Sequence, residues 1–94
     1  MTMSEAIRTY NMSGGYFFSP DTMKFWESKI ETELINDEYF VTSEPDMYGR
    51  SRRCTVRRFT KGYTEVETVG GFRQYGSVRM AVRDIENILR GVVK

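Results

Sequence analysis

Apolar positions along the chain follow two different spacings, and each spacing predicts a different kind of element. Near the C-terminus apolar residues recur every three or four positions after Ser77, which is suited to be a helix N-cap. This stripe consists of Val78, Ala81, Val82, Ile85, Ile88, Leu89 and Val92. The same spacing follows Ser19 and Pro20, where the apolar members are Met23, Trp26, Ile30 and Leu34. Two amphipathic helices are therefore expected, the first running from Pro20 to about Leu34.

The segment between these helices is rich in β-branched and aromatic residues and is interrupted by Pro and Gly. These residue types predict three strands, at Tyr39–Ser43, Arg52–Phe59 and Tyr63–Val69. A three-residue turn ending at Gly62, in the left-handed conformation, would join the last two strands. That turn is favoured over a two-residue one because it keeps apolar residues on one face of the hairpin.

The expected hairpin register pairs residues of like character across the two strands. Val56 would lie opposite Val66, and Arg57 would lie opposite Glu65 on the other face. Cys54 and Val56 would then face the core, and Arg57 would already be neutralised by its cross-strand neighbour. Arg58, near the end of its strand, is expected to extend outward from the core side.

This order predicts an α+β fold, a two-layer sandwich of helix, three-stranded antiparallel sheet and helix (αβββα). Residues 16–94 would form the single domain, and residues 1–15 a flexible N-terminal extension, because Gly14 and Gly15 follow a weakly patterned segment. The alternative for the leader is a short helix from Ser4 to Thr9. A chain of 94 residues has room for one core, to which Trp26, Tyr39, Phe40 and Phe59 are expected to contribute.

Composition argues against most kinds of chemistry. The chain has no histidine, which removes the commonest general base and metal ligand, and Cys54 is its only cysteine. Metal-binding and phosphate-binding motifs are missing from the sequence, and no apolar run is long enough for a membrane span. The prediction is a non-enzymatic protein without cofactor or metal, in a reducing cytoplasm.

Charge is segregated along this chain, although its net charge is only +1. A basic stretch between Met47 and Lys61 contains no acid, whereas the segment before it is acidic. The candidate binding residues of the basic loop and strand are Tyr48, Arg50, Arg52, Arg53 and Lys61. Those of the acidic first helix are Glu27, Glu31 and Glu33. Phe25, off the apolar stripe, is expected either to pack against Tyr16-Phe17-Phe18 or to remain as exposed contact surface. Phe72 and Tyr75, in a predicted loop, are further candidates for contact with a partner.

The order of elements and the segment Gly76–Arg83 resemble double-stranded-RNA-binding domains, whose last helix starts with a Gly-Ser-Lys-Lys-x-Ala-Lys signature. Here the departure is that Val78 and Met80 leave the cluster short of its lysines, and that Asp84 and Glu86 follow at once. The resemblance implies that Arg79 and Arg83 contact phosphates across a groove, while the loop Tyr48–Arg53 meets the minor groove.

A second resemblance covers more of the chain. The segments Tyr16–Phe25, Tyr39–Glu44 and Arg53–Arg58 look like short uncharacterised proteins of tailed bacteriophages and prophages. Because small phage proteins without enzymatic motifs often dock on host machinery, this resemblance implies an anti-defence protein, for example an anti-CRISPR inhibitor of a nucleic-acid-handling complex. The resemblance implies that the partner is a host protein or ribonucleoprotein complex in the cytoplasm of a bacterial host cell.

Two further classes stay open: a direct binder of double-stranded RNA or DNA, and a structural module associated with the virion. The sequence is also compatible with a homodimer, because the last strand lies at a sheet edge and Val92-Val93 extends the apolar surface.

Overall fold

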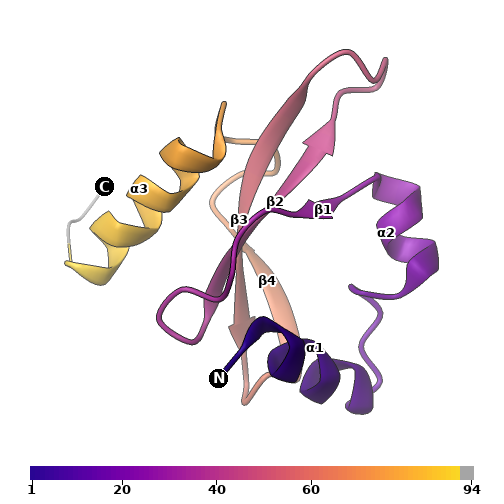
Figure 1. Ribbon diagram of the computed structural model, residues 1–94, viewed down its shortest axis with the longest axis vertical. Coiled ribbons are helices and arrows are strands. Elements are labelled where there is room, and N and C mark those ends of the chain that lie inside the picture. The colour runs from indigo at the N-terminus through magenta and orange to yellow at the C-terminus, as the bar shows by residue number, and fades with distance from the viewer. Residues whose placement is uncertain (92–94) are drawn as a thin grey trace.

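The computed structural model describes residues 1–91 and confirms the predicted α+β class (Figure 1). The helices are α1 (Met3–Met12), α2 (Pro20–Trp26) and α3 (Val78–Leu89). The strands are β1 (Lys29–Ile30), β2 (Tyr39–Pro45), β3 (Arg52–Thr60) and β4 (Glu65–Val69). All strands pair with their sequence neighbours in an antiparallel sheet of order β1-β2-β3-β4. Compared with the expected order, the structure adds helix α1 and strand β1.

Helices cover both faces of the sheet, where a two-layer arrangement was expected (Figure 1). On one face Val41 and Val56 pack against Ile85 of α3, and on the other Phe40 and Phe59 pack against α1. The alternation of side chains along β2 and β3 explains this arrangement, since consecutive residues of a strand point to opposite faces. Both faces carry large apolar side chains, so both need cover.

The N-terminal segment is a helix and not the flexible leader that its composition suggested. Thr2 caps α1 and forms a capping box with Glu5, whose side chain accepts from the Thr2 backbone N–H. Met3, Ala6 and Tyr10 are buried in the core against the sheet. The alternative of a short helix is therefore correct for this segment, and the helix is longer than the Ser4–Thr9 span.

Helix α2 ends eight residues earlier than its apolar spacing indicated. Glu27 closes it in the left-handed conformation, with φ of 50°, and the chain then turns into β1. In β1, Lys29 pairs with Ser43 and Ile30 with Thr42, so backbone pairing with β2 replaces further helical hydrogen bonds. The expected acidic helix face is consequently wrong, because Glu31 and Glu33 lie outside the helix.

Strands β2, β3 and β4 occur where they were expected, but the β3–β4 register differs. Val56 pairs with Val69, Arg57 with Thr68 and Phe59 with Val66, around the four-residue connection 61–64. The expected pairing of Arg57 with Glu65 is wrong. The preference for a three-residue turn assumed one polar face, whereas each face here needs an apolar residue from β4, so the chain takes the longer turn. Gly62 adopts the left-handed conformation as predicted.

Helix α3 follows the prediction closely. Ser77 caps it by accepting from the backbone N–H of Met80, and Ala81 and Ile85 are fully buried. Val92 and Val93, the end of the expected apolar stripe, lie outside the described residues. No helix of residues 1–91 is long and apolar enough to cross a membrane.

Candidate functional site

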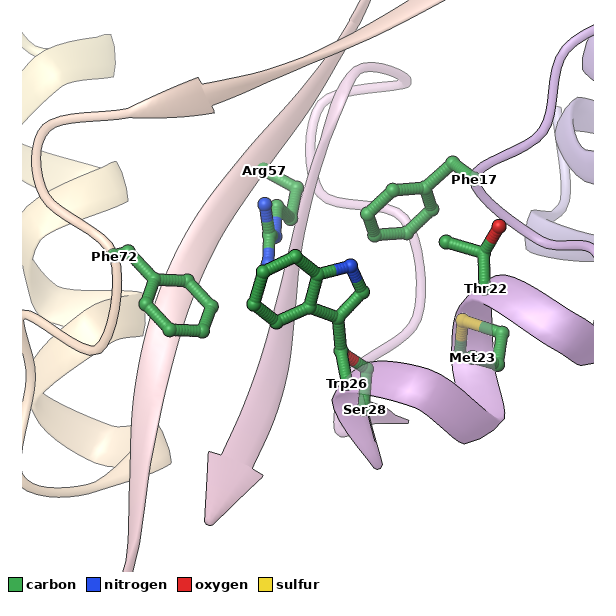
Figure 2. Close-up of a pocket in the computed structure, with 7 residues that line it drawn as sticks. All are labelled: Phe17, Thr22, Met23, Trp26, Ser28, Arg57 and Phe72. Carbon is green, nitrogen blue, oxygen red and sulfur yellow. The ribbon is translucent and has the colours of Figure 1, made fainter. Parts of the chain in front are cut away.

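A cavity of about 230 Å³ opens between α2, strand β3 and the loop that precedes α3 (Figure 2). Its lining residues are Phe17, Thr22, Met23, Trp26, Ser28, Arg57 and Phe72. Pro20 and the Ser19 cap start α2, which brings Thr22, Met23 and Trp26 to the cavity, and Ser28, just after the early end of the helix, joins them. The walls are mainly aromatic and aliphatic. We call this cavity the aromatic pocket.

Arg57, which lines the aromatic pocket, belongs to a buried ion pair with Glu44. Nη2 of Arg57 lies 3.3 Å from Oε2 of Glu44, and the two side chains are 11% and 1% exposed. Thr55 and Ser28 each donate a hydroxyl hydrogen bond of 2.8 Å to the Glu44 carboxylate. The carboxylate thus has a partner on each oxygen, which is the condition under which a buried charge is tolerated.

Arg57 is held in place by hydrogen bonds from three of its nitrogens. Nε donates to Thr42 at 3.1 Å, and Nη1 donates to Thr68 at 2.7 Å, in addition to the Nη2 contact with Glu44. Burial lowers the pKa of Arg57, while the neighbouring Glu44 carboxylate opposes that shift. The guanidinium lies 5.1 Å from the ring centroid of Phe17 and 5.8 Å from that of Phe72, within range of cation–π attraction.

An exposed aromatic surface borders the pocket. We define the aromatic surface as Phe25, Trp26, Met47 and Phe72, which share a shallow recess beside α2. Phe25 is 77% exposed and Met47 is 87% exposed, and Trp26 and Phe72 are about half exposed. The Trp26 ring contacts Phe25 and Phe72 edge-to-face, with centroid separations of 5.1 and 5.7 Å. Trp26 is therefore not the core residue that the helical spacing suggested.

Part of the predicted basic loop is engaged in hydrogen bonds to backbone carbonyl groups elsewhere in the domain. Arg52 donates to the carbonyl oxygens of Glu27 and Ser43, which ties the loop to the end of α2. The Arg50 guanidinium lies over the Tyr48 ring at 4.7 Å, and both side chains are exposed. Lys61 lies at the far end of β3, paired with Glu65 at 3.3 Å, so it is not part of the loop.

Arg53 is brought close to the start of α3. It donates to the carbonyl oxygens of Arg73 and Gln74, and its Nη1 would lie 3.7 Å from a Cβ placed on Gly76. Met80 of α3 meets the same position at the same distance. Two groups predicted separately, the basic strand and the basic helix, are thus adjacent through Gly76.

The remaining candidates are dispersed. Arg79 and Arg83 are exposed on α3, and neither makes an ion pair within the described residues. Glu27 is the C-cap of α2, and Glu31 accepts a hydrogen bond from the Ser43 hydroxyl. Glu33 is exposed after β1, so the three acids do not form one helix face.

Arg58 and Cys54 lie as the sequence predicted. Arg58 extends outward as predicted and binds two carboxylates, those of Glu38 at 3.0 Å and Glu67 at 3.3 Å. Cys54 is buried as predicted, and burial raises the pKa of its thiol.

The sequence did not predict the ion pair of Glu44 with Arg57. It gave no β2–β3 register, and it suggested that Arg57 lies on an exposed face.

A protein-family model, described as a family of unknown function (DUF7447), matches residues 2–86. The chain belongs to this family. No curated protein and no solved structure matches the sequence or the fold. The family description names no activity, so the resemblances to phage proteins and to double-stranded-RNA-binding domains stay predictions for this DUF7447 member.

The described residues of this DUF7447 protein contain no group of three or more metal-ligating side chains that would hold an ion. What they do bring together is a rigid cavity with one buried guanidinium, next to an exposed aromatic surface. Aromatic residues, Met and Arg are the types enriched where proteins bind other proteins.

Proposed function

We propose that the protein is a binding module that docks on a partner protein through its aromatic surface. The observation that carries the proposal is the clustering of the exposed Phe25 and Met47 with the half-exposed Trp26 and Phe72 around one recess. Contiguous exposed apolar groups of this kind are typical of interaction sites.

The surroundings of the surface fit an interface better than a reaction site. The Glu44 carboxylate accepts from Arg57, Ser28 and Thr55, so it is engaged in structural contacts and is not free to act as a general base. Arg73 and Glu27 line the recess beside Phe25 and provide the polar rim that protein interfaces commonly have. The proposed module is therefore non-enzymatic.

The class of partner is proposed from the sequence. Its resemblance to small phage proteins favours a host protein or ribonucleoprotein complex that handles nucleic acid, and an inhibitory role in defence. In that setting the aromatic surface would supply the affinity, and the exposed Tyr48–Arg50 pair at the tip of the β2–β3 loop would add contacts to an acidic region of the partner.

Paired surface variants test the proposal. Phe25→Ser/Met47→Ser removes the two most exposed members of the aromatic surface. Met12→Ser/Tyr16→Ser is a matched control, because these residues are 82% and 79% exposed but are not part of the aromatic surface. A tagged protein is used to recover complexes from the cells that produce it, and the bound proteins are identified and quantified. We expect one partner to be lost from the first variant and kept by the control.

Equal loss or equal retention in the two variants would overturn the proposed docking surface. Thermal unfolding of each variant is measured alongside, and both should unfold at the temperature of the wild type, since all four side chains are exposed.

A second function is favoured by one observation, the adjacency of Arg53 to the start of α3. Together with Arg79 and Arg83 it would form a basic surface for double-stranded RNA or DNA. The test is a titration with a duplex at several salt concentrations. Arg79→Ala/Arg83→Ala should weaken binding and reduce the salt dependence by about two phosphate contacts. Unchanged binding in this variant would remove the second function.

A further inference from the structure

We propose that the aromatic pocket holds a tyrosine side chain of the partner protein. The inference rests on the proposed function and goes beyond it by naming the group that is recognised. Three properties of the pocket support it: its volume, the hydrogen-bonding groups that line it, and the charge balance of Arg57 with Glu44 (Figure 2).

The volume fits a single substituted benzene ring. An apolar protein cavity of about 150 Å³ is known to accept benzene. The aromatic pocket, at about 230 Å³, has room for the ring and for one polar substituent. Drug-sized ligands generally occupy larger pockets, of roughly 300–1,000 Å³.

The walls favour an aromatic ring over an aliphatic chain. Phe17, Trp26 and Phe72 stand around the opening, and Figure 2 shows their rings grouped about the Arg57 guanidinium. Aromatic rings gain additional attraction from edge-to-face contacts with one another. The Met23 thioether completes the lining and is favourable beside aromatic groups.

The Arg57 side of the pocket favours a ligand that carries a hydrogen-bond acceptor. A guanidinium has five N–H donors, and Arg57 uses three of them within the described residues, on Thr42, Thr68 and Glu44. The residue is only 9% exposed, so bulk solvent does not fully satisfy the two others. A ligand without an acceptor would exclude water from these two N–H groups without replacing the lost hydrogen bonds, which costs free energy.

The acceptor should also be able to donate. Ser28 lines the pocket and gives its own proton to Glu44, so its oxygen keeps a lone pair for a ligand proton. A phenol hydroxyl meets both requirements, since it accepts from Arg57 and donates to Ser28. Among neutral side chains, tyrosine is the one that combines a benzene ring with such a hydroxyl.

Charge balance argues against an anionic ligand. Glu44 neutralises Arg57 at 3.3 Å, so the Arg57 side of the pocket has no net charge. A carboxylate placed there would lose its hydration and would also face the Glu44 carboxylate. A cation would meet the Arg57 charge without a free counter-ion. The neutral phenol avoids both penalties.

Small probes test the pocket without the partner. The probes are 4-methylphenol, toluene and 4-methylbenzoate, which share the ring and methyl group and differ only in the substituent. Trp26 is the single tryptophan of the chain and lines the pocket, so its indole N–H signal in a ¹⁵N-labelled sample reports binding directly. We expect 4-methylphenol to bind about fivefold more tightly than toluene, which corresponds to one ordinary hydrogen bond.

We also expect 4-methylbenzoate to bind more weakly than 4-methylphenol. Equal affinity for toluene and 4-methylphenol, tighter binding of 4-methylbenzoate, or no binding of any probe would overturn the inference. Phe72→Ala removes a wall of the pocket and should weaken 4-methylphenol binding, whereas Phe25→Ala is the control, because Phe25 does not line this cavity. Equal effects of the two variants would also count against it.

A competition experiment links the pocket to the partner. 4-methylphenol should displace the captured partner from the wild-type protein, and changing the contacting tyrosine of the partner to phenylalanine should reduce its affinity by about fivefold. If Phe25→Ser/Met47→Ser abolishes capture but the probe does not compete, the docking surface stands and the tyrosine inference fails. If the probe binds selectively but the surface variants leave capture unchanged, the proposed function fails and the pocket remains a phenol site.

Discussion

Replacing Glu44 by glutamine removes the negative charge of the buried ion pair. The amide is close to the carboxylate in shape, so the packing around it is preserved, but it carries no charge. Arg57, only 9% exposed, would then be left as a buried cation without a counter-ion. Thr55 and Ser28 donate to different carboxylate oxygens, and the amide keeps only one oxygen, so one hydroxyl also loses its acceptor.

The expected loss of stability is large for a single substitution. Removing one member of a buried pair costs about 3–5 kcal/mol, because the remaining charge is desolvated and uncompensated. Lys61–Glu65 provides the comparison, since it has the same 3.3 Å separation but side chains that are 71% and 55% exposed. Glu65→Gln should therefore cost less than about 1 kcal/mol. Burial, and not distance, decides the difference between the two pairs.

Urea unfolding followed by Trp26 fluorescence measures both variants. With a denaturant slope of about 2 kcal/mol/M, a loss of about 3 kcal/mol lowers the midpoint by about 1.5 M. The free energy of unfolding of a domain of this size is roughly 5–14 kcal/mol, so over most of that range the variant stays folded after such a loss. The double variant Glu44→Gln/Arg57→Met should cost about 2 kcal/mol less than the sum of the single variants. Similar costs for Glu44→Gln and Glu65→Gln, or strict additivity in the cycle, would refute the reasoning.

Three further predictions follow from local contacts. The thiol of Cys54, whose pKa is raised by burial, should react with a disulfide reagent at pH 8 only after unfolding in urea, and rapid labelling of the native protein would contradict its burial. Tyr75→Phe removes a hydroxyl that donates to the buried Asp84 carboxylate, and should lower the free energy of unfolding by about 1–3 kcal/mol in urea titrations. The hydrogen bonds from Thr2 lower the pKa of Glu5 from 4.5, so the charged cap stabilises α1 above that pH, and this stabilisation is lost as the pH falls through the folded-state value. Glutamine can keep the capping box but carries no charge, so the difference in stability between wild type and Glu5→Gln should shrink below pH 4, and a constant difference would exclude a contribution of the Glu5 charge.

Elements with strong local signals were predictable. Helix α3 begins where Ser77 stands as a cap, and its apolar residues recur at the helical period. Strands β2 and β3 coincide with the runs of β-branched and aromatic residues around Val41 and Val56. In these segments the local preference and the tertiary packing favour the same structure, so the period alone was sufficient.

Two elements were misjudged for different reasons. For α1 a signal existed in the sequence, since Thr2 and Glu5 have the spacing of a capping box and Met3, Ala6 and Tyr10 lie on one helical face. For α2 the apolar spacing continued to Leu34, but Ile30 pairs with β2 instead. Here sheet pairing overrides the local preference, because the edge of β2 offers partners for the backbone groups.

Some residues of the candidate site were predictable from the sequence, and others were not. Exposed contact surface at Phe25 and Phe72 was suggested by their positions off the apolar stripe and in a loop, and both are exposed. The same suggestion for Tyr75 is wrong, because its ring is buried in the core beside α3. Trp26 was assigned to the core and lies at the surface. The pocket itself was not predictable, because its residues come from the α1–α2 connection, α2, β3 and the loop before α3, which are far apart in the sequence.

By itself, the sequence determined where the chain forms helices and strands with strong periodicity, the absence of histidine chemistry, and the burial of Cys54. Capping, β-propensity and residue inventory act over a few neighbouring positions, so they can be read locally. Only the tertiary structure decided that Val56 pairs with Val69 and that Arg57 meets Glu44 inside the domain. A register shift by an odd number of residues exchanges the two faces of a strand, so the partner of each charge depends on how both faces of the sheet are covered.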